Sequence, residues 1–256
     1  MKIERAERHE LLAGHPILAD HLKRYQQLTY DPANCRYRAG EEVWLEPGAD
    51  APTVLSEEQA AKLNRETEEE MAALKDGFSP GIVARAPIDS LIVAMNARSM
   101  EDFVARFGTV FTNLADQLGW SEFVVLTGVR QPLLGQENDH PPVLAAEDHL
   151  LEAGFSRTEP HGLASDLEGF ASILGSLFWI ARCNAAAPHI LFAAKGSASV
   201  GTLCQYANIH FDIYEPQEAN LLGNALEPNG LCQPPDGICR EILSQTSAIP
   251  GRAIEL

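Results

Sequence analysis

Apolar residues recur at intervals of three and four in several segments of the chain, which is the pattern of helices with one buried face. Residues 1–30 show this pattern on either side of a break at Gly14. A second helix is predicted over 56–75, because Ser56 and Gln59 have the types and spacing of a capping box. Both segments also carry many charged residues, so we expect each helix to have one exposed face.

Two further segments are predicted to form the helices of the core. Residues 99–119 place phenylalanine and leucine side chains along one helical face and end at a glycine. Residues 165–187 are apolar on nearly every side, which predicts a central helix covered by other elements. This helix is expected to begin with a capping box at Ser165. Shorter helices are predicted over 143–153, 216–226 and 236–245.

Strands are predicted where β-branched residues cluster or where apolar and polar residues alternate. These segments are 42–46, 87–96, 121–129, 189–195 and 202–214. The mixture of helices and strands predicts an α+β fold, with a mixed or antiparallel sheet packed against the central helix at about 165–187 and against flanking helices. We expect one compact domain over 1–256, with residues 1–80 as a candidate helical and acidic subdomain.

The segment AAKGSASVGT, residues 193–202, has the glycine spacing of a phosphate-binding loop. Such a loop requires a lysine after the second glycine, followed by a helix whose amides meet the phosphate. Thr202 occupies the lysine position, and the next predicted element is a strand. The segment is therefore predicted to be a hairpin turn and not a nucleotide site.

The charge of the chain is strongly acidic and unevenly distributed. Its formal net charge is −17, and residues 41–70 alone hold ten acidic and two basic residues. Such a charge repels nucleic acid and anionic membranes and attracts basic proteins. No apolar segment is long enough to span a bilayer, the first residues lack a signal-peptide pattern, and the five cysteines are an odd number. We therefore expect a cytoplasmic protein with no nucleic-acid or membrane partner.

The cysteine and histidine residues do not form a recognisable metal-binding or catalytic motif. No CxxC pair is present, although structural zinc sites usually contain one. Cys204 and His210 are expected to lie roughly 20 Å apart on one continuous strand, too far for the histidine to activate the thiol. His210 and Asp212 share one strand face and could supply two metal ligands. The sequence therefore predicts no metal and no cofactor, with an uncommon hydrolase using His210 and Asp212 as an alternative.

These observations favour a binding protein over an enzyme. We expect an immunity protein or inhibitor that neutralises a basic toxin, such as a nuclease effector, by protein–protein binding. An adaptor or chaperone for a secreted effector is the other alternative. Trp44 is an interface anchor or a core residue, since aromatic side chains serve as both. The expected partner-binding residues are Glu41, Glu42, Trp44, Glu57, Glu58, Glu68, Glu69, Glu70, Glu137 and Asp139.

Overall fold

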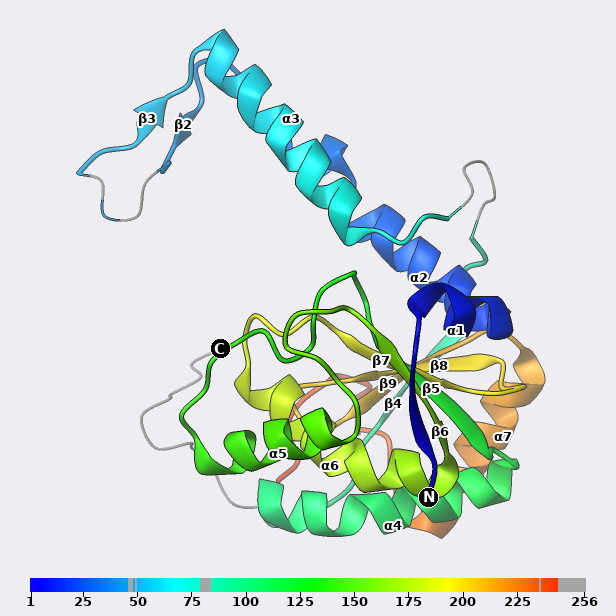
Figure 1. Ribbon diagram of the computed structural model, residues 1–256. Coiled ribbons are helices and arrows are strands. Elements are labelled where there is room, and N and C mark those ends of the chain that lie inside the picture. Colours follow the sequence, from blue (N-terminus) through cyan, green and yellow to red (C-terminus); the bar gives the residue numbers. More distant parts are fainter. Residues whose placement is uncertain (46–47, 49, 79–83, 235, 244–256) are drawn as a thin grey trace.

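A computed structural model describes residues 1–45, 48, 50–78, 84–234 and 236–243. Its centre is a seven-stranded sheet in which every pair of neighbouring strands is antiparallel (Figure 1). The α+β architecture and the antiparallel sheet agree with the prediction. In spatial order the strands are β1 (Ile3–Ala6), β6 (Gly162–Asp166), β5 (Glu122–Thr127), β7 (Ile190–Ala194), β8 (Ser199–Leu203), β9 (Ile209–Ile213) and β4 (Asp89–Val93).

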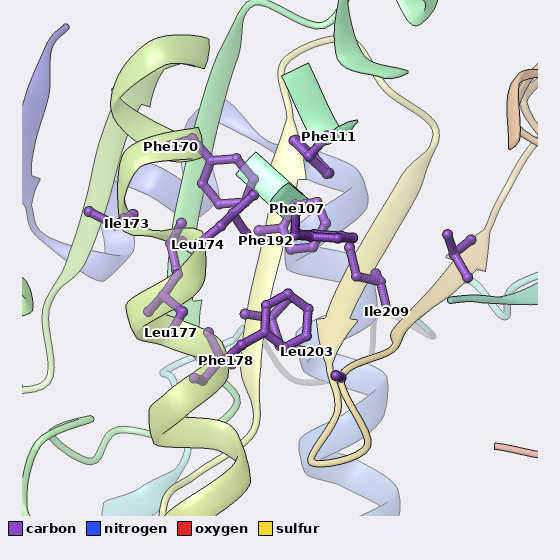
Figure 2. Close-up of a cluster of buried hydrophobic side chains, with 14 of the residues drawn as sticks. Phe107, Phe111, Phe170, Ile173, Leu174, Leu177, Phe178, Phe192, Leu203 and Ile209 are labelled. Carbon is purple, nitrogen blue, oxygen red and sulfur yellow. The ribbon is translucent and has the colours of Figure 1, made fainter. Parts of the chain in front are cut away.

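Helices on one face of the sheet enclose the main core. They are α4 (Met100–Leu118), α5 (Pro141–Glu152), α6 (Leu167–Cys183) and α7 (Pro216–Leu226), which a short 3-10 turn, η2 (Glu227–Asn229), follows. The central helix α6 packs against both α4 and α5, as its apolar sequence predicts. Figure 2 shows α6 side chains meeting Phe107 of α4 and Phe192 of the sheet. The rings of Phe107 and Phe178 lie 5.2 Å apart at 85°, the edge-to-face geometry that aromatic pairs prefer.

Two short helices cover part of the other face. They are α1 (Arg8–Gly14) and α2 (Pro16–Thr29), and the predicted break at Gly14 separates them. Leu18 and Leu22 of α2 are fully buried and pack in a second apolar cluster with Leu126 and Val200 of the sheet. The sheet is therefore covered on both faces. Among the described residues, no helix is long and apolar enough to cross a lipid bilayer.

The third part of the molecule, which we call the arm, comprises the described residues between 31 and 75. It contains a short 3-10 turn, η1 (Pro32–Cys35), a hairpin of β2 (Glu42–Val43) and β3 (Thr53–Val54), and the long helix α3 (Glu57–Leu74). Figure 1 shows α3 and its hairpin projecting away from the sheet and the helices around it. Within residues 1–80, α1 and α2 thus pack on the sheet, whereas α3 extends into solvent.

A buried ion pair ties the base of the arm to the sheet. Arg8 donates two hydrogen bonds to the carboxylate of Asp76, at 2.9 and 2.7 Å, and both side chains are almost completely buried. The same arginine donates to the carbonyl and hydroxyl oxygens of Thr127 in β5. Gln26 of α2 completes the network by donating to Asp76 and by accepting from its backbone N–H. The end of α3 is therefore fixed where α1, α2 and the sheet meet.

Most predicted helices are present, including α3 with its capping box. Ser56 Oγ accepts from the backbone N–H of Gln59, and Gln59 Oε1 accepts from that of Ser56. The predicted cap at Ser165 is wrong, because Ser165 belongs to β6 and Asp166 caps α6 instead. The predicted helix over 236–245 is also wrong for its described part, 236–243, which contains a turn at Asp236 and Gly237 and bridges to Ala97 through Leu243.

The glycine-containing segment 193–202 is the turn between β7 and β8, as predicted. Gly196 adopts φ +78°, a left-handed conformation that glycine accepts without strain. Gly201 lies within β8 and not in a loop. The segment therefore joins two adjacent antiparallel strands and presents no helix N-terminus to a phosphate.

Candidate functional site

The acidic residues of the arm occupy most of the circumference of α3. Its least exposed stripe recurs at helical spacing and is formed by Ala60, Leu63, Thr67, Met71 and Leu74, of which Ala60 is buried. At ~100° per residue, the acidic positions of the helix span roughly 220° of its remaining surface. The five predicted contact residues on α3 are all exposed, namely Glu57, Glu58, Glu68, Glu69 and Glu70. The helix thus presents a broad anionic surface that few other residues cover.

The hairpin of the arm adds exposed apolar side chains to this surface. Trp44 is 64% exposed, and Leu45 and Val54 beside it in the hairpin are 43% and 60% exposed. Trp44 therefore does not belong to the core of this chain. Glu41 and Glu42, which precede it, are exposed as well. The structure brings these predicted contact residues together on one projecting element.

The remaining predicted contact residues lie elsewhere. Glu137 and Asp139 are exposed in the loop that joins β5 to α5, outside the arm. This loop starts close to the arm, because Arg130 donates a backbone hydrogen bond to the carbonyl of Leu74 at the end of α3. No hydrogen bond or ion pair among the described residues connects Glu137 or Asp139 with the arm.

A second candidate site is a cluster of two thiols and one imidazole, formed by Cys204, His210 and Cys239. The Nε2 atom of His210 lies 3.0 Å from Cys239 Sγ, and Cys204 Sγ lies 3.3 Å from the same sulfur. Their potential ligand atoms all lie within 4.8 Å of one another. The expected separation of roughly 20 Å between Cys204 and His210 is therefore wrong.

A tight turn between β8 and β9 explains the difference. The backbone of Cys204 pairs with that of Asn208, and Ala207 adopts φ +58°, so the chain reverses where a continuous strand is expected. In the resulting register His210 lies opposite Thr202. Because side chains two residues apart on a strand point to the same face, Cys204, Asn208 and His210 share one face of the hairpin.

The third member of the cluster comes from the segment after α7. Asn208, which is fully buried, donates to the carbonyl oxygen of Arg240 and to Cys239 Sγ, at 2.9 and 3.4 Å. Arg182 of α6 forms an ion pair with Glu241 at 3.0 Å and donates to the carbonyl of Gln205 in the turn. These contacts hold Cys239 against the hairpin.

The cluster is half-buried, and this burial shifts the pKa values of two of its members. Burial raises the pKa of the Cys204 thiol to about 12, so this thiol is protonated near neutral pH. Burial also lowers the pKa of His210 and outweighs the opposing effect of Asp212, so the imidazole is neutral. A cavity of about 320 Å³ adjoins the cluster, and its lining includes Asn184, His189, Thr202, Cys204, Gln205 and His210.

His210 and Asp212 do not act as a pair, although they lie on the same strand face as predicted. The carboxylate of Asp212 lies 3.4 Å from Nδ1 of His21 in α2, and that imidazole also contacts the hydroxyl of Tyr214 at 3.1 Å. His210 instead contacts Cys239. The geometry therefore does not favour the hydrolase hypothesis that combines His210 with Asp212.

Comparisons with protein families, with curated proteins and with solved structures find no match for this chain. They do not indicate any enzyme family. The functional interpretation of both sites consequently depends on their geometry and chemistry.

Proposed function

We propose that this protein is an acidic binding protein that neutralises a basic protein partner through its arm. The observation that carries this proposal is the combination of exposed glutamates on α3 with the exposed Trp44 at the adjoining hairpin. Negative charge accelerates the encounter with a cationic surface, and a tryptophan at the same surface supplies the apolar anchor that strong protein interfaces contain.

We further propose that the partner is a basic toxin of the nuclease type, so that the protein acts as an immunity protein. Nucleases bind phosphate in cationic grooves, and a projecting anionic helix has a shape and charge that such a groove can accept. The compartment is proposed to be the cytoplasm, since an odd number of cysteines, five, fits a reducing compartment better than a disulfide scaffold.

The first experiment is capture of the partner by the tagged protein from a lysate of its source, at low and at high salt. We expect one stoichiometric basic protein, bound at low salt and lost at high salt, whose nuclease activity the purified protein inhibits. A partner that stays bound at high salt contradicts the electrostatic proposal. An adaptor for a secreted protein is indicated instead if the partner is apolar and retains its activity in the complex.

Matched variants connect the binding to the arm. The arm variant E58Q/E68Q/E69Q/E70Q and the body variant D116N/D148N/E152Q/E227Q each remove four negative charges from exposed positions. We expect the arm variant to lose most of its affinity and the body variant to bind almost as the wild type does. Equal loss in both variants indicates attraction by overall charge without a defined binding surface.

Trp44→Ala tests the apolar part of the proposed surface. We expect binding to weaken by about 2 kcal/mol, as for an aromatic residue at the centre of an interface. Leu221→Ala, which truncates an apolar side chain of similar exposure on α7, serves as the control. Unchanged affinity of Trp44→Ala in calorimetric titration excludes Trp44 from the interface.

A further inference from the structure

Cys204, His210 and Cys239 bring three soft or borderline ligand atoms to one point. Cys204 directly follows β8, His210 is the second residue of β9, and Cys239 lies in the segment after α7. The other cysteines do not join them, since Cys35 is exposed on the arm, Cys183 lies on α6 and Cys232 contacts the carbonyl of Ala94. The cluster is thus a specific product of the fold.

We propose that Cys204, His210 and Cys239 bind a Zn²⁺ ion, with the fourth coordination position open to the adjoining cavity. The proposal is independent of the arm and of any partner. Two thiolates and one imidazole are a ligand set that zinc prefers, and three protein ligands with one exchangeable position are typical of zinc sites that bind a water or a small ligand.

The observed distances are close to those that zinc requires. Tetrahedral zinc with bonds of about 2.3 Å to sulfur and about 2.0 Å to nitrogen separates its ligand atoms by roughly 3.5–3.8 Å. The contacts at Cys239 Sγ are 3.0 Å to His210 Nε2 and 3.3 Å to Cys204 Sγ. Each of these two pairs therefore has to separate by only ~0.5 Å to admit the ion, and the ligand atoms of the third pair, Cys204 and His210, lie within 4.8 Å of each other.

The groups around the cluster are suited to a bound cation. Zn²⁺ with two thiolates and a neutral imidazole has no net charge, which makes the ion compatible with a half-buried position. The side-chain amide of Asn208 donates to Cys239 Sγ, the type of hydrogen bond that orients a metal-bound ligand. The Oδ1 atom of Asn208 is buried and has no hydrogen-bond partner among the described residues, so it remains as an acceptor next to the site.

The cavity explains the open position. Cys204 and His210 both contribute to its lining, together with the polar side chains of His189, Thr202 and Gln205. A volume of about 320 Å³ is sufficient for water and a small polar molecule. We therefore assign the fourth position to an exchangeable water.

The ion is tested on the untagged full-length protein, reduced and then freed of metal by a chelator. We expect one Zn²⁺ per chain by competition with a chromophoric chelator. Co²⁺ added in its place should give thiolate-to-metal charge-transfer absorption in the near ultraviolet and the strong visible bands of a tetrahedral site. No zinc uptake by the reduced, folded protein overturns the proposal, and so does Co²⁺ absorption without a thiolate contribution.

Single variants assign the ligands. Cys204→Ser, Cys239→Ser and His210→Gln should each weaken zinc binding at least ~10-fold, whereas Cys35→Ser and Cys232→Ser should bind like the wild type. Circular dichroism of each metal-free variant separates loss of a ligand from loss of the fold. A Cys204–Cys239 disulfide that persists in the protein under mild reducing conditions, detected by mass spectrometry, contradicts the proposal.

Discussion

Gly201 occupies a position in β8 at which any side chain meets the core. A Cβ atom added there lies 2.3 Å from Cε1 and Cζ of Phe192 in the neighbouring strand, and this buried ring has little room to move. We expect Gly201→Ala to lower the free energy of unfolding by about 1–3 kcal/mol, the usual effect of overpacking.

The same substitution at Gly223 is the matched control. Gly223 is exposed on α7, and an added Cβ meets nothing within 4 Å. Gly223→Ala is expected to raise the free energy of unfolding by roughly 0.5–1 kcal/mol, because alanine favours the helix. Urea denaturation measures both variants, and a change of the same sign in the two contradicts the packing explanation.

His21 makes the stability of the fold dependent on pH. Burial lowers its pKa, and Arg24 adds to this, although Asp212 opposes it. The unfolded chain therefore binds a proton near pH 6.5 that the folded chain does not bind until lower pH. The contribution of the neutral imidazole is present above about pH 6.5 and decreases as the pH falls through the folded pKa.

His21→Asn removes this titration. We expect the wild type to lose more free energy of unfolding than the variant between about pH 7.5 and about pH 5, because only the wild type gains the proton on unfolding. Urea denaturation at both pH values gives the decrease in the free energy of unfolding for each protein. Comparing the two decreases removes any difference in stability that already exists at neutral pH. Equal losses show that His21 does not contribute to the acid sensitivity.

The positions of single residues also explain why the thiol–imidazole cluster is difficult to predict. The alternation of apolar and polar residues over 202–214 is compatible with one strand, and nothing in the residue type marks Ala207 as left-handed. Cys239 is held at the hairpin by the contacts of Asn208 with Arg240 and of Arg182 with Glu241, which join residues more than thirty positions apart. If a turn is assumed at residues 205–207, Cys204 comes to lie beside His210. No pattern in the sequence indicates Cys239 as the third residue of the cluster.

At the scale of elements, helices and strands with local signals are correctly predicted, including β4, β5 and β7, whereas β1 and β6 are missed. α3 and α4 have caps and a periodic apolar face within their own sequence. The strand β1 consists of four residues and depends on pairing with β6, which lies about 160 residues later. The same distant pairing explains the error at Ser165, since β6 extends through the residue that the local pattern predicts as a cap.

The junction between the arm and the sheet depends on the buried pair of Arg8 and Asp76. Asp76→Ala leaves the guanidinium of Arg8 buried without its carboxylate partner. We expect the free energy of unfolding to fall by about 3–5 kcal/mol. Glu66→Ala, which breaks the exposed pair of Lys62 and Glu66 on α3, should cost less than about 1 kcal/mol. Similar losses in the two variants in thermal or urea denaturation contradict the role given to Asp76.

At the scale of the whole molecule, the sheet and its helices form a support from which an anionic element projects (Figure 1). Residues 41–70 carry a formal charge of −8 out of the total −17. The concentration of charge is evident in the sequence, and so is the helix α3, which holds six of the ten acidic residues in this segment. The projection of this helix, and the exposure of Trp44 beside it, depend on the tertiary structure and cannot be predicted from the local pattern.

The most direct test of binding through the arm is the salt dependence of partner binding by the wild type and by E58Q/E68Q/E69Q/E70Q. Calorimetric titration with the purified partner from about 50 mM to about 500 mM NaCl gives Kd for both proteins. We expect Kd of the wild type to rise steeply with salt. We expect the variant to bind more weakly at low salt, and its Kd to depend less on salt. Equal Kd values and equal salt dependence for the two proteins contradict binding through the arm.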